Sequence, residues 1–135
     1  MRLRRVAIVD IDLAQGATRT VRADAASLGH ALWNLLDNAV EYSPGCNRVR
    51  IALSGRGKHK VVISVSDDGI GVPRGERAVI FEKFIRGEQA TRLGIKGTGV
   101  GLAMVSHIVA AHGGVVELQS TEGQGSTFMM VLPIA

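Results

Sequence analysis

Two asparagines, Asn34 and Asn38, stand four residues apart within the largely apolar segment Leu32–Pro44. In a helix, this spacing places both amides on one face. An asparagine can offer its carbonyl oxygen to a hard cation, or its N–H groups to a phosphate, without adding charge. The pair therefore indicates a candidate cation and phosphate site, and the plainer alternative is a polar stripe that faces the solvent.

The carboxylate of Asp67 is expected on the buried face of a strand. Hydrophobic residues alternate along Lys60–Ser66, and the same period of two continues onto Asp67. A carboxylate at the end of a core-facing row is costly to bury unless another group pairs with it. Asp67 is therefore a candidate ligand-binding residue, and the glycines and proline within Asp68–Pro73 end the strand.

Three glycines, Gly97, Gly99 and Gly101, stand at the start of a predicted helix that runs to His112. Glycines at such a place leave backbone N–H groups exposed at the positive end of the helix dipole, which suits a phosphate. The run does not fit a Walker loop, and the third glycine of a Rossmann fingerprint is replaced here by Leu102. The glycines indicate a phosphate cradle of another type, with a simple tight turn as the alternative.

The elements that would position these residues follow from periodicity and from turn residues. Asp24 is a good N-cap for the asparagine-bearing helix, which must end by Ser43 because Pro44 follows. The order of elements predicts one α/β domain over residues 1–135, a two-layer α/β sandwich in which a mixed, mostly antiparallel sheet carries three helices on one face. The other expected elements are strands at Arg5–Asp12, Thr18–Arg22, Arg48–Ser54, Lys60–Ser66, Val115–Ser120 and Ser126–Leu132, a short helix at Glu76–Phe84, and a candidate lid at Gly87–Lys96.

Composition limits the classes of function. The chain has 135 residues, 46% of them hydrophobic, with no run of about 18 apolar residues and no signal-peptide pattern, so no membrane contact is expected. The single cysteine, Cys46, suits a reducing cytoplasm. A net charge of +4 favours anionic ligands, but aromatic residues make up only 4% and the basic residues are scattered, which argues against nucleic acid. The histidines lack metal-ligand spacing, so zinc is not expected.

Four motifs in a fixed order resemble those of the catalytic ATP-binding domain of sensor histidine kinases. This family lies within the wider group that contains gyrase-type, mismatch-repair and heat-shock chaperone ATPases, and the resemblance implies their Bergerat-type ATP-binding fold. Each motif is weak by itself, but four in order over nearly the whole chain are specific. The motifs are an N box at Asn34–Ala39, a first glycine box at Asp67–Gly71, an F box at Phe81–Arg86 and a second glycine box at Gly97–Leu102, and Gly123–Phe128 resembles the closing strand pair.

The resemblance implies ATP and Mg²⁺ as cofactors and gives the candidate residues roles. Asp67 is expected to accept a hydrogen bond from the adenine amino group, with Gly71 allowing the backbone close to the base and Tyr42 packing near it. Asn38 is the expected Mg²⁺ ligand, with Asn34 beside it. The full implied nucleotide site is Asn34, Asn38, Tyr42, Asp67, Gly69, Gly71, Arg86, Lys96, Gly97, Gly99, Gly101, Leu102 and Ser126.

The remaining implied roles concern charge and shape around the triphosphate. Arg86, and Lys96 as a second candidate, would add positive charge near the phosphates, so that Asn34, Asn38 and Arg86 form the candidate catalytic set. The glycines of the second glycine box would shape the lid hinge and the phosphate cradle. Ser126 would reach the adenine side through water.

The sequence departs from the family pattern in two places. The family usually has a lysine or arginine three residues after the second N-box asparagine, whereas this chain has Glu41, which weakens phosphate binding unless it faces away or Lys96 or Arg86 compensates. Sensor kinases also carry a phosphoaccepting histidine with an acidic neighbour on a helical hairpin. None of the four histidines here has such a neighbour, so all are expected to be structural or surface residues: His30, His59, His107 and His112.

The resulting hypothesis is a protein-histidine kinase domain that donates the γ-phosphoryl group of ATP to a histidine on a separate hairpin. The implied partners are that hairpin and a downstream response regulator. The isolated domain is expected to be monomeric and cytoplasmic, although a full-length sensor can be tethered to a membrane. An ATP hydrolase is disfavoured because those relatives have a glutamate where this chain has Asn34, and an amide cannot serve as that base. An anti-sigma-type serine kinase and a degenerate nucleotide-binding module remain alternatives.

Overall fold

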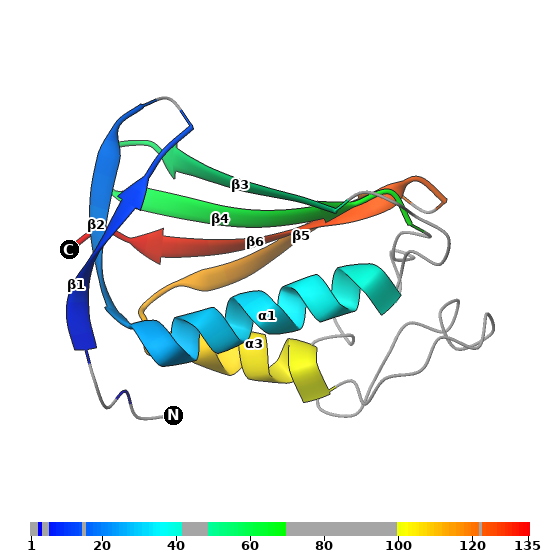
Figure 1. Cartoon of the computed structure of the whole chain (residues 1–135), viewed down its shortest axis with the longest axis horizontal. Helices are drawn as coiled ribbons and strands as arrows, with labels where there is room; N and C mark the ends of the chain where they lie inside the picture. The colour runs from blue at the N-terminus through cyan, green and yellow to red at the C-terminus, as the bar shows by residue number, and fades with distance from the viewer. Residues whose placement is uncertain (1–2, 4–5, 15, 42–48, 70–99, 122) are drawn as a thin grey trace.

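The computed structural model of the chain describes residues 3, 6–14, 16–41, 49–69, 100–121 and 123–135. These residues form two layers, a four-stranded sheet covered on one face by helices α1 and α3 (Figure 1). The predicted two-layer α/β sandwich is therefore confirmed. The elements are β1 (Val6–Asp12), β2 (Thr18–Asp24), α1 (Ala25–Glu41), β3 (Val49–Arg56), β4 (Lys60–Asp67), α3 (Val100–Ala111), β5 (Val115–Thr121) and β6 (Gly125–Pro133).

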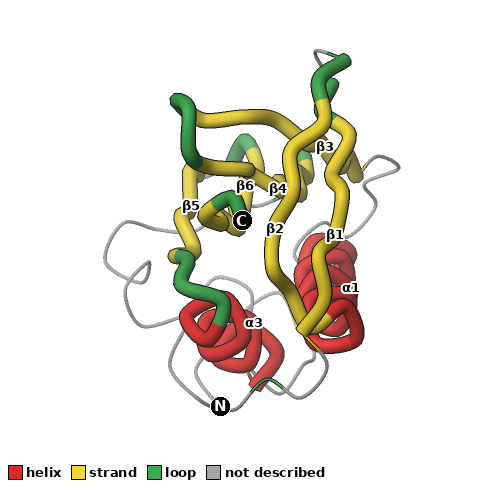
Figure 2. The backbone as a smooth tube through the Cα atoms, turned by 90° about the vertical axis from the view of Figure 1, so that its left-hand side faces the viewer, coloured by secondary structure: helices red, strands yellow, loops and turns green. Residues whose placement is uncertain are grey.

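The sheet has the strand order β3-β4-β6-β5, and each pair of neighbouring strands in it is antiparallel. The mixed character that the sequence predicts is thus not seen among the described strands. Figure 2 shows the two helices side by side beneath the sheet, and they contact each other as well as the strands. The predicted short helix at Glu76–Phe84 and the candidate lid at Gly87–Lys96 lie outside the described residues.

The first two strands form a separate antiparallel hairpin across the left-hand end of the sheet in Figure 1. The second strand extends two residues beyond the predicted Thr18–Arg22, because Ala23 and Asp24 still pair with β1. The hairpin is attached to the sheet by a hydrogen bond of 3.0 Å from Ala14 N to Leu53 O. It is also attached by the guanidinium of Arg19, which donates to two carbonyls in and beside the turn that joins β3 and β4.

Helix α1 begins at Ala25 because Asp24 caps it, with Ser27 N donating to Asp24 Oδ1 at 3.2 Å. An apolar stripe of this helix packs against the sheet. Leu28, Leu35 and Ala39 are buried, and Leu32 is half-buried against them. Trp33 and Val40 are not part of that core, because their exposed fractions are 63% and 65%.

The core lies between the helices and the inner face of the sheet. Alternation places Val61, Ile63 and Val65 of β4 on this face, together with Phe128, Met130 and Leu132 of β6, and all six are buried. The corresponding row of β3 is only partly covered, because β3 is an edge strand: Ile51 remains 51% exposed, and Val49 and Leu53 are only partly buried. On the central strands β4 and β6, the residues that face the helices are therefore buried. On the edge strand β3, the residues of the same face stay partly exposed.

Helix α3 ends at Ala111, one residue before the predicted end, and Gly113 follows with a positive φ of 78°. The amide of Gly114 donates to Val109 O at 2.9 Å, which satisfies a carbonyl of the last turn. A Cβ at Gly114 would collide with the backbone oxygen of Val131. Glycine at this position thus allows the end of α3 to pack closely against β6.

Candidate functional site

Asp67 and Ser126 face each other across β4 and β6 at the end of the sheet farthest from the β1–β2 hairpin. Both continue the helix-facing rows of their strands, and both are buried, with exposed fractions of 5% and 4%. Directly opposed residues in an antiparallel pair have Cβ atoms about 5 Å apart, so the two side chains are neighbours. The structure therefore brings together two residues that the sequence analysis assigned to one site from different motifs.

The carboxylate of Asp67 is fixed by the turn that follows it. Its Oδ1 accepts a hydrogen bond of 2.9 Å from the backbone N–H of Gly69. This bond closes a local turn of the kind that Asp side chains often form with the backbone two residues later. The acidic group is thus held at the end of β4 while the chain turns away from the sheet.

Gly125 allows β6 to approach this point closely. Its φ is 108°, and a Cβ there would collide with the backbone oxygen of Asp67. Only glycine accommodates both the left-handed backbone and the close approach. The first residue of β6 therefore helps to set the distance between Asp67 and Ser126.

Ser120 supplies a further hydroxyl on the same face of the sheet. Its Oγ lies 3.0 Å from Ser126 Oγ and donates to the Gly125 carbonyl at 3.1 Å. The sequence patterns do not single out Ser120 as a site residue. The signal that could do so is the hairpin register, because Ser120 and Ser126 are directly paired in it.

Asn34 and Asn38 lie in the part of α1 that runs toward the same end of the sheet (Figure 1). Asn38 is buried, with an exposed fraction of 5%, whereas Asn34 is half-buried. The Nδ2 atom of Asn38 is buried and makes no hydrogen bond within the described part of the chain. A buried amide of this kind is usually paired, so Asn38 stays a candidate ligand-binding residue.

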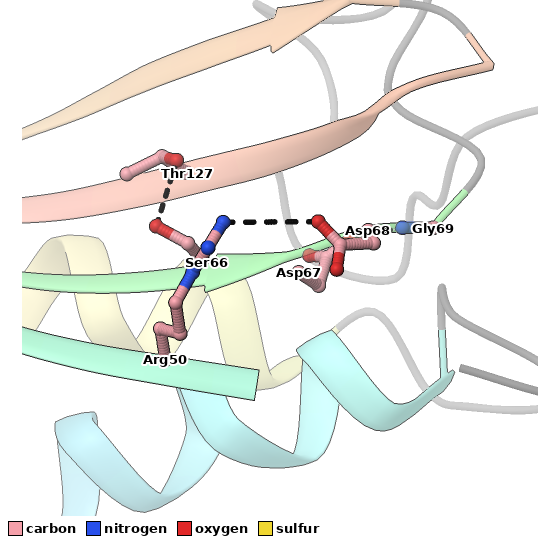
Figure 3. Close-up of polar contacts among 6 residues, drawn as sticks. All are labelled: Arg50, Ser66, Asp67, Asp68, Gly69 and Thr127. Atoms are coloured by element: carbon pink, nitrogen blue, oxygen red, sulfur yellow. Dashed lines mark hydrogen bonds and ion pairs between the residues drawn. The ribbon is translucent and has the colours of Figure 1, made fainter. Parts of the chain in front are cut away.

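The outer face of the sheet is polar at this end. Figure 3 shows Arg50 paired with Asp68 at 3.8 Å, and Ser66 hydrogen-bonded to Thr127 at 2.9 Å. The ion pair is exposed and contributes little to stability. A polar hollow of about 260 Å³ lies around these strand ends, and its lining comes from both faces of the sheet: Asp67, Ser120 and Ser126 from the helix-facing side, and Arg50, Ser66 and Thr127 from the outer side.

The other expected site residues lie either at the ends of the two helices or outside the described part of the chain. Gly101 lies in the first turn of α3, and the side chain of Leu102 is buried in the core, so it is available to a ligand only through its backbone. Glu41 ends α1, and its side chain is not among those described. The site residues that lie outside the described part of the chain are Tyr42, Gly71, Arg86, Lys96, Gly97 and Gly99.

The histidines are placed as expected. His30, His59 and His107 are exposed, and His112 is buried as a structural residue.

Within the described ranges, no group of three or more histidine, cysteine or acidic residues is placed to hold a metal ion. Helices long and apolar enough to cross a membrane are likewise absent from the described residues.

Comparison with known proteins gives consistent matches. The family described as histidine kinase-, DNA gyrase B-, and HSP90-like ATPase matches residues 23–135. The sensor-like histidine kinase SenX3 of Mycobacterium bovis is 39% identical over 126 residues, which cover 92% of this chain and 30% of that protein. This chain therefore corresponds to less than a third of the length of that relative.

Solved structures agree with these matches. The mycobacterial sensor histidine kinase MprB superposes with a TM-score of 0.77 at 34% identity, covering 87% of this chain and 78% of that chain. Full-length ShkA, in a crystal structure with AMPPNP, superposes with a TM-score of 0.74 at 37% identity. That match covers 87% of this chain and 23% of the ShkA chain.

Proposed function

Because the chain belongs to the family of histidine kinase-, DNA gyrase B- and HSP90-like ATPases, we propose that it is the catalytic ATP-binding domain of a sensor histidine kinase. The family binds ATP, SenX3 and MprB are named as sensor histidine kinases, and full-length ShkA was crystallised in complex with AMPPNP. The observation that carries the proposal is the buried carboxylate of Asp67, which lies opposite Ser126 at one end of the sheet.

Asp67 and Ser126 form the base-binding part of the proposed site. A carboxylate only accepts hydrogen bonds, and an amino group on a base only donates them, so the two are complementary. Water would connect Ser126 to the same side of the base. Gly69 donates to Asp67 and keeps its carboxylate in place, and Gly71 and Tyr42 would complete the surroundings of the base.

The amide of Asn38 is suited to the phosphate end of the site. It is buried on α1 and has an N–H group without a partner in the described residues. Rotation of the amide exchanges its oxygen and nitrogen, so the same side chain can bind a cation or a phosphate oxygen. Asn38 would hold Mg²⁺, with Asn34 one turn earlier, and the ion would neutralise the negative charge of the triphosphate.

The remaining candidates complete the phosphate end of the proposed site. Arg86 and Lys96 would add positive charge, and Gly97, Gly99 and Gly101 would offer backbone N–H groups. Charge neutralisation and positioning supply most of the catalysis in phosphoryl transfer.

The proposed reaction is transfer of the γ-phosphoryl group to a histidine on a separate helical hairpin. Hydrolysis is disfavoured because Asn34 is an amide and cannot remove a proton from water. The proposed partners are this hairpin and a response regulator. The proposed location is the cytoplasm, where ATP is supplied.

Titration calorimetry with ATP tests the nucleotide site. Asp67→Asn is expected to lower the affinity for ATP by at least about tenfold, because it removes a charge-assisted hydrogen bond. Asp68→Asn is the matched control, since Asp68 is the next residue, is exposed and pairs only weakly with Arg50. Equal affinity for ATP in the Asp67→Asn variant and the wild type would remove the base from this site.

A further inference from the structure

An apolar cavity of about 200 Å³ lies where the N-terminal half of α1 runs beside β1 (Figure 2). Its floor is formed by buried side chains of three elements, with exposed fractions of 8% for Leu28 of α1, 6% for Ile63 of β4 and 0% for Met130 of β6. Val9 of β1 and Leu32 of α1 are half-buried and form its walls. The cavity therefore reaches from the surface to the hydrophobic core.

Small residues of α1 form the mouth of this cavity. Ala25 and Gly29 stand one turn apart on the helix, both line the cavity, and both are exposed. A Cβ at Gly29 would meet nothing within 4 Å, so no close neighbour requires glycine there. Glycine is nevertheless less favourable than alanine inside a helix. Gly29 thus keeps the mouth open at a cost to the stability of α1.

The lining decides what kind of molecule the cavity can hold. Each of the described residues that line it is apolar, so their side chains offer no charge, hydrogen-bond donor or strong acceptor. An ordered water needs about two to four polar partners, and a dry apolar cavity of about 150 Å³ can hold benzene. The volume and the lining of this cavity therefore suit one small neutral ring.

The cavity is separate from the nucleotide site described above. Along the axis of α1, Gly29 and Asn38 are about 14 Å apart. Asp67 lies at the end of the sheet farthest from the β1–β2 hairpin (Figure 1). A ligand in the apolar cavity would therefore not compete with ATP, and an inference about this cavity does not depend on the proposed function.

We propose that the apolar cavity is a binding site for a small neutral aromatic molecule of the size of benzene or toluene. The bound ring contacts β1, α1 and the two central strands together, because residues of all four elements line the cavity. Removal of apolar surface from water supplies the affinity. Binding also holds the hairpin against α1, so it stabilises the folded state.

Benzene is the probe, and two neighbouring methionines report where it binds. Met130 lines the cavity, whereas Met129 belongs to a separate cluster with Val62 and Val131 on the opposite face of the sheet. In protein labelled with carbon-13 at the methionine methyl groups, benzene is expected to shift the Met130 resonance until the site is saturated. The Met129 resonance is expected to stay in place. Benzene at about ten times its Kd should raise the midpoint of thermal unfolding by about 3–6 °C.

Two alanines at the start of α1 provide matched variants. Ala25 lines the cavity and Ala26 does not, and both are exposed. Ala25→Leu is expected to fill the mouth and to weaken benzene binding by at least about tenfold, whereas Ala26→Leu keeps the wild-type affinity. Gly29→Leu is a second filling variant from the next turn, with the same expected loss.

A Met130 resonance that does not move with benzene, or equal shifts of Met129 and Met130, would overturn the inference. Unchanged benzene binding in both filling variants would do the same. A midpoint of unfolding that rises with protein concentration but not with benzene would assign the cavity to a second copy of the chain, and this too would overturn it. These outcomes leave ATP binding untouched, so the proposed function is tested separately.

Discussion

The imidazole of His112 joins the end of α3 to the start of α1 through the backbone of Asp24. His112 Nε2 accepts a hydrogen bond of 3.1 Å from Asp24 N, and its Nδ1 lies 2.8 Å from Ile108 O. Since Nε2 accepts, the ring proton must reside on Nδ1 and be donated to Ile108 O. Asp24 in turn caps α1 through Ser27 N. One buried side chain thus connects the two helices that cover the sheet.

This connection predicts that His112→Ala destabilises the fold. The substitution leaves the Asp24 amide without its acceptor, at a cost of about 1–3 kcal/mol in the free energy of unfolding. Urea denaturation measures the change. His107→Ala is the control, because His107 is exposed on the same helix, and its effect is expected to stay within about 0.5 kcal/mol. Equal losses in the two variants would mean that the link between the helices has no energetic importance.

Asn38→Ala is expected to remove most of the dependence of ATP affinity on Mg²⁺. Asn38 is the buried amide on α1 that has an N–H group without a partner in the described residues, so its loss affects the bound cation more than the packing. Titration calorimetry with and without Mg²⁺ measures the effect. Asp37→Ala, at the adjacent exposed position, serves as the control. If Asn38→Ala lowers the two affinities by the same factor, Asn38 does not hold the cation.

Gly125→Ala tests the close approach of β6 to β4. The added Cβ collides with the backbone oxygen of Asp67 and the residue must keep a φ of 108°, so we expect a loss of about 1–3 kcal/mol in stability and weaker ATP binding. Gly123→Ala is the matched control. Its φ is also positive, at 82°, but a Cβ there meets nothing within 4 Å. ATP affinity that falls equally in both variants would assign the effect to the turn and not to the approach of the strands.

Gly29→Ala is expected to act in the opposite direction. Gly29 lies within α1, is exposed, and has nothing within 4 Å of the position of an added Cβ. Alanine is favoured over glycine inside a helix by about 1 kcal/mol. The midpoint of thermal unfolding should therefore rise. A fall in this midpoint would show that the apolar cavity of about 200 Å³ that Gly29 lines beside β1 needs the glycine.

Local patterns predict the parts of the fold that depend on one strand or one helix. The period of two along β4 places Asp67 on the buried face, and Asp24 marks the start of α1, and both hold in the structure. The exposure of Ile51 could not be predicted in this way, because it depends on β3 lying at the edge of the sheet. The same limit applies to Trp33, which is apolar but is covered by no described element.

The residues of the candidate site divide in the same way, into those that one segment identifies and those that require two strands to be placed together. Single motifs identify Asn38, Asp67 and Ser126, each from its own segment. The hydroxyl network of Ser120 requires the register between β5 and β6, which is fixed by the length of the turn between them. The collision that restricts Gly125 to glycine similarly requires the position of β4 relative to β6.

Phosphoryl transfer to a separate histidine tests the central claim most directly. Radiolabelled ATP is supplied to this domain alone, to a helical-hairpin domain carrying a His-Glu or His-Asp pair alone, and to the two together, with the Asp67→Asn variant as the inactive partner. The label is expected on the hairpin histidine only when both domains are present, in a product that is labile to acid and stable to alkali, as a phosphoramidate is. An acid-stable product on a serine, or strong labelling of this domain alone, would contradict the account.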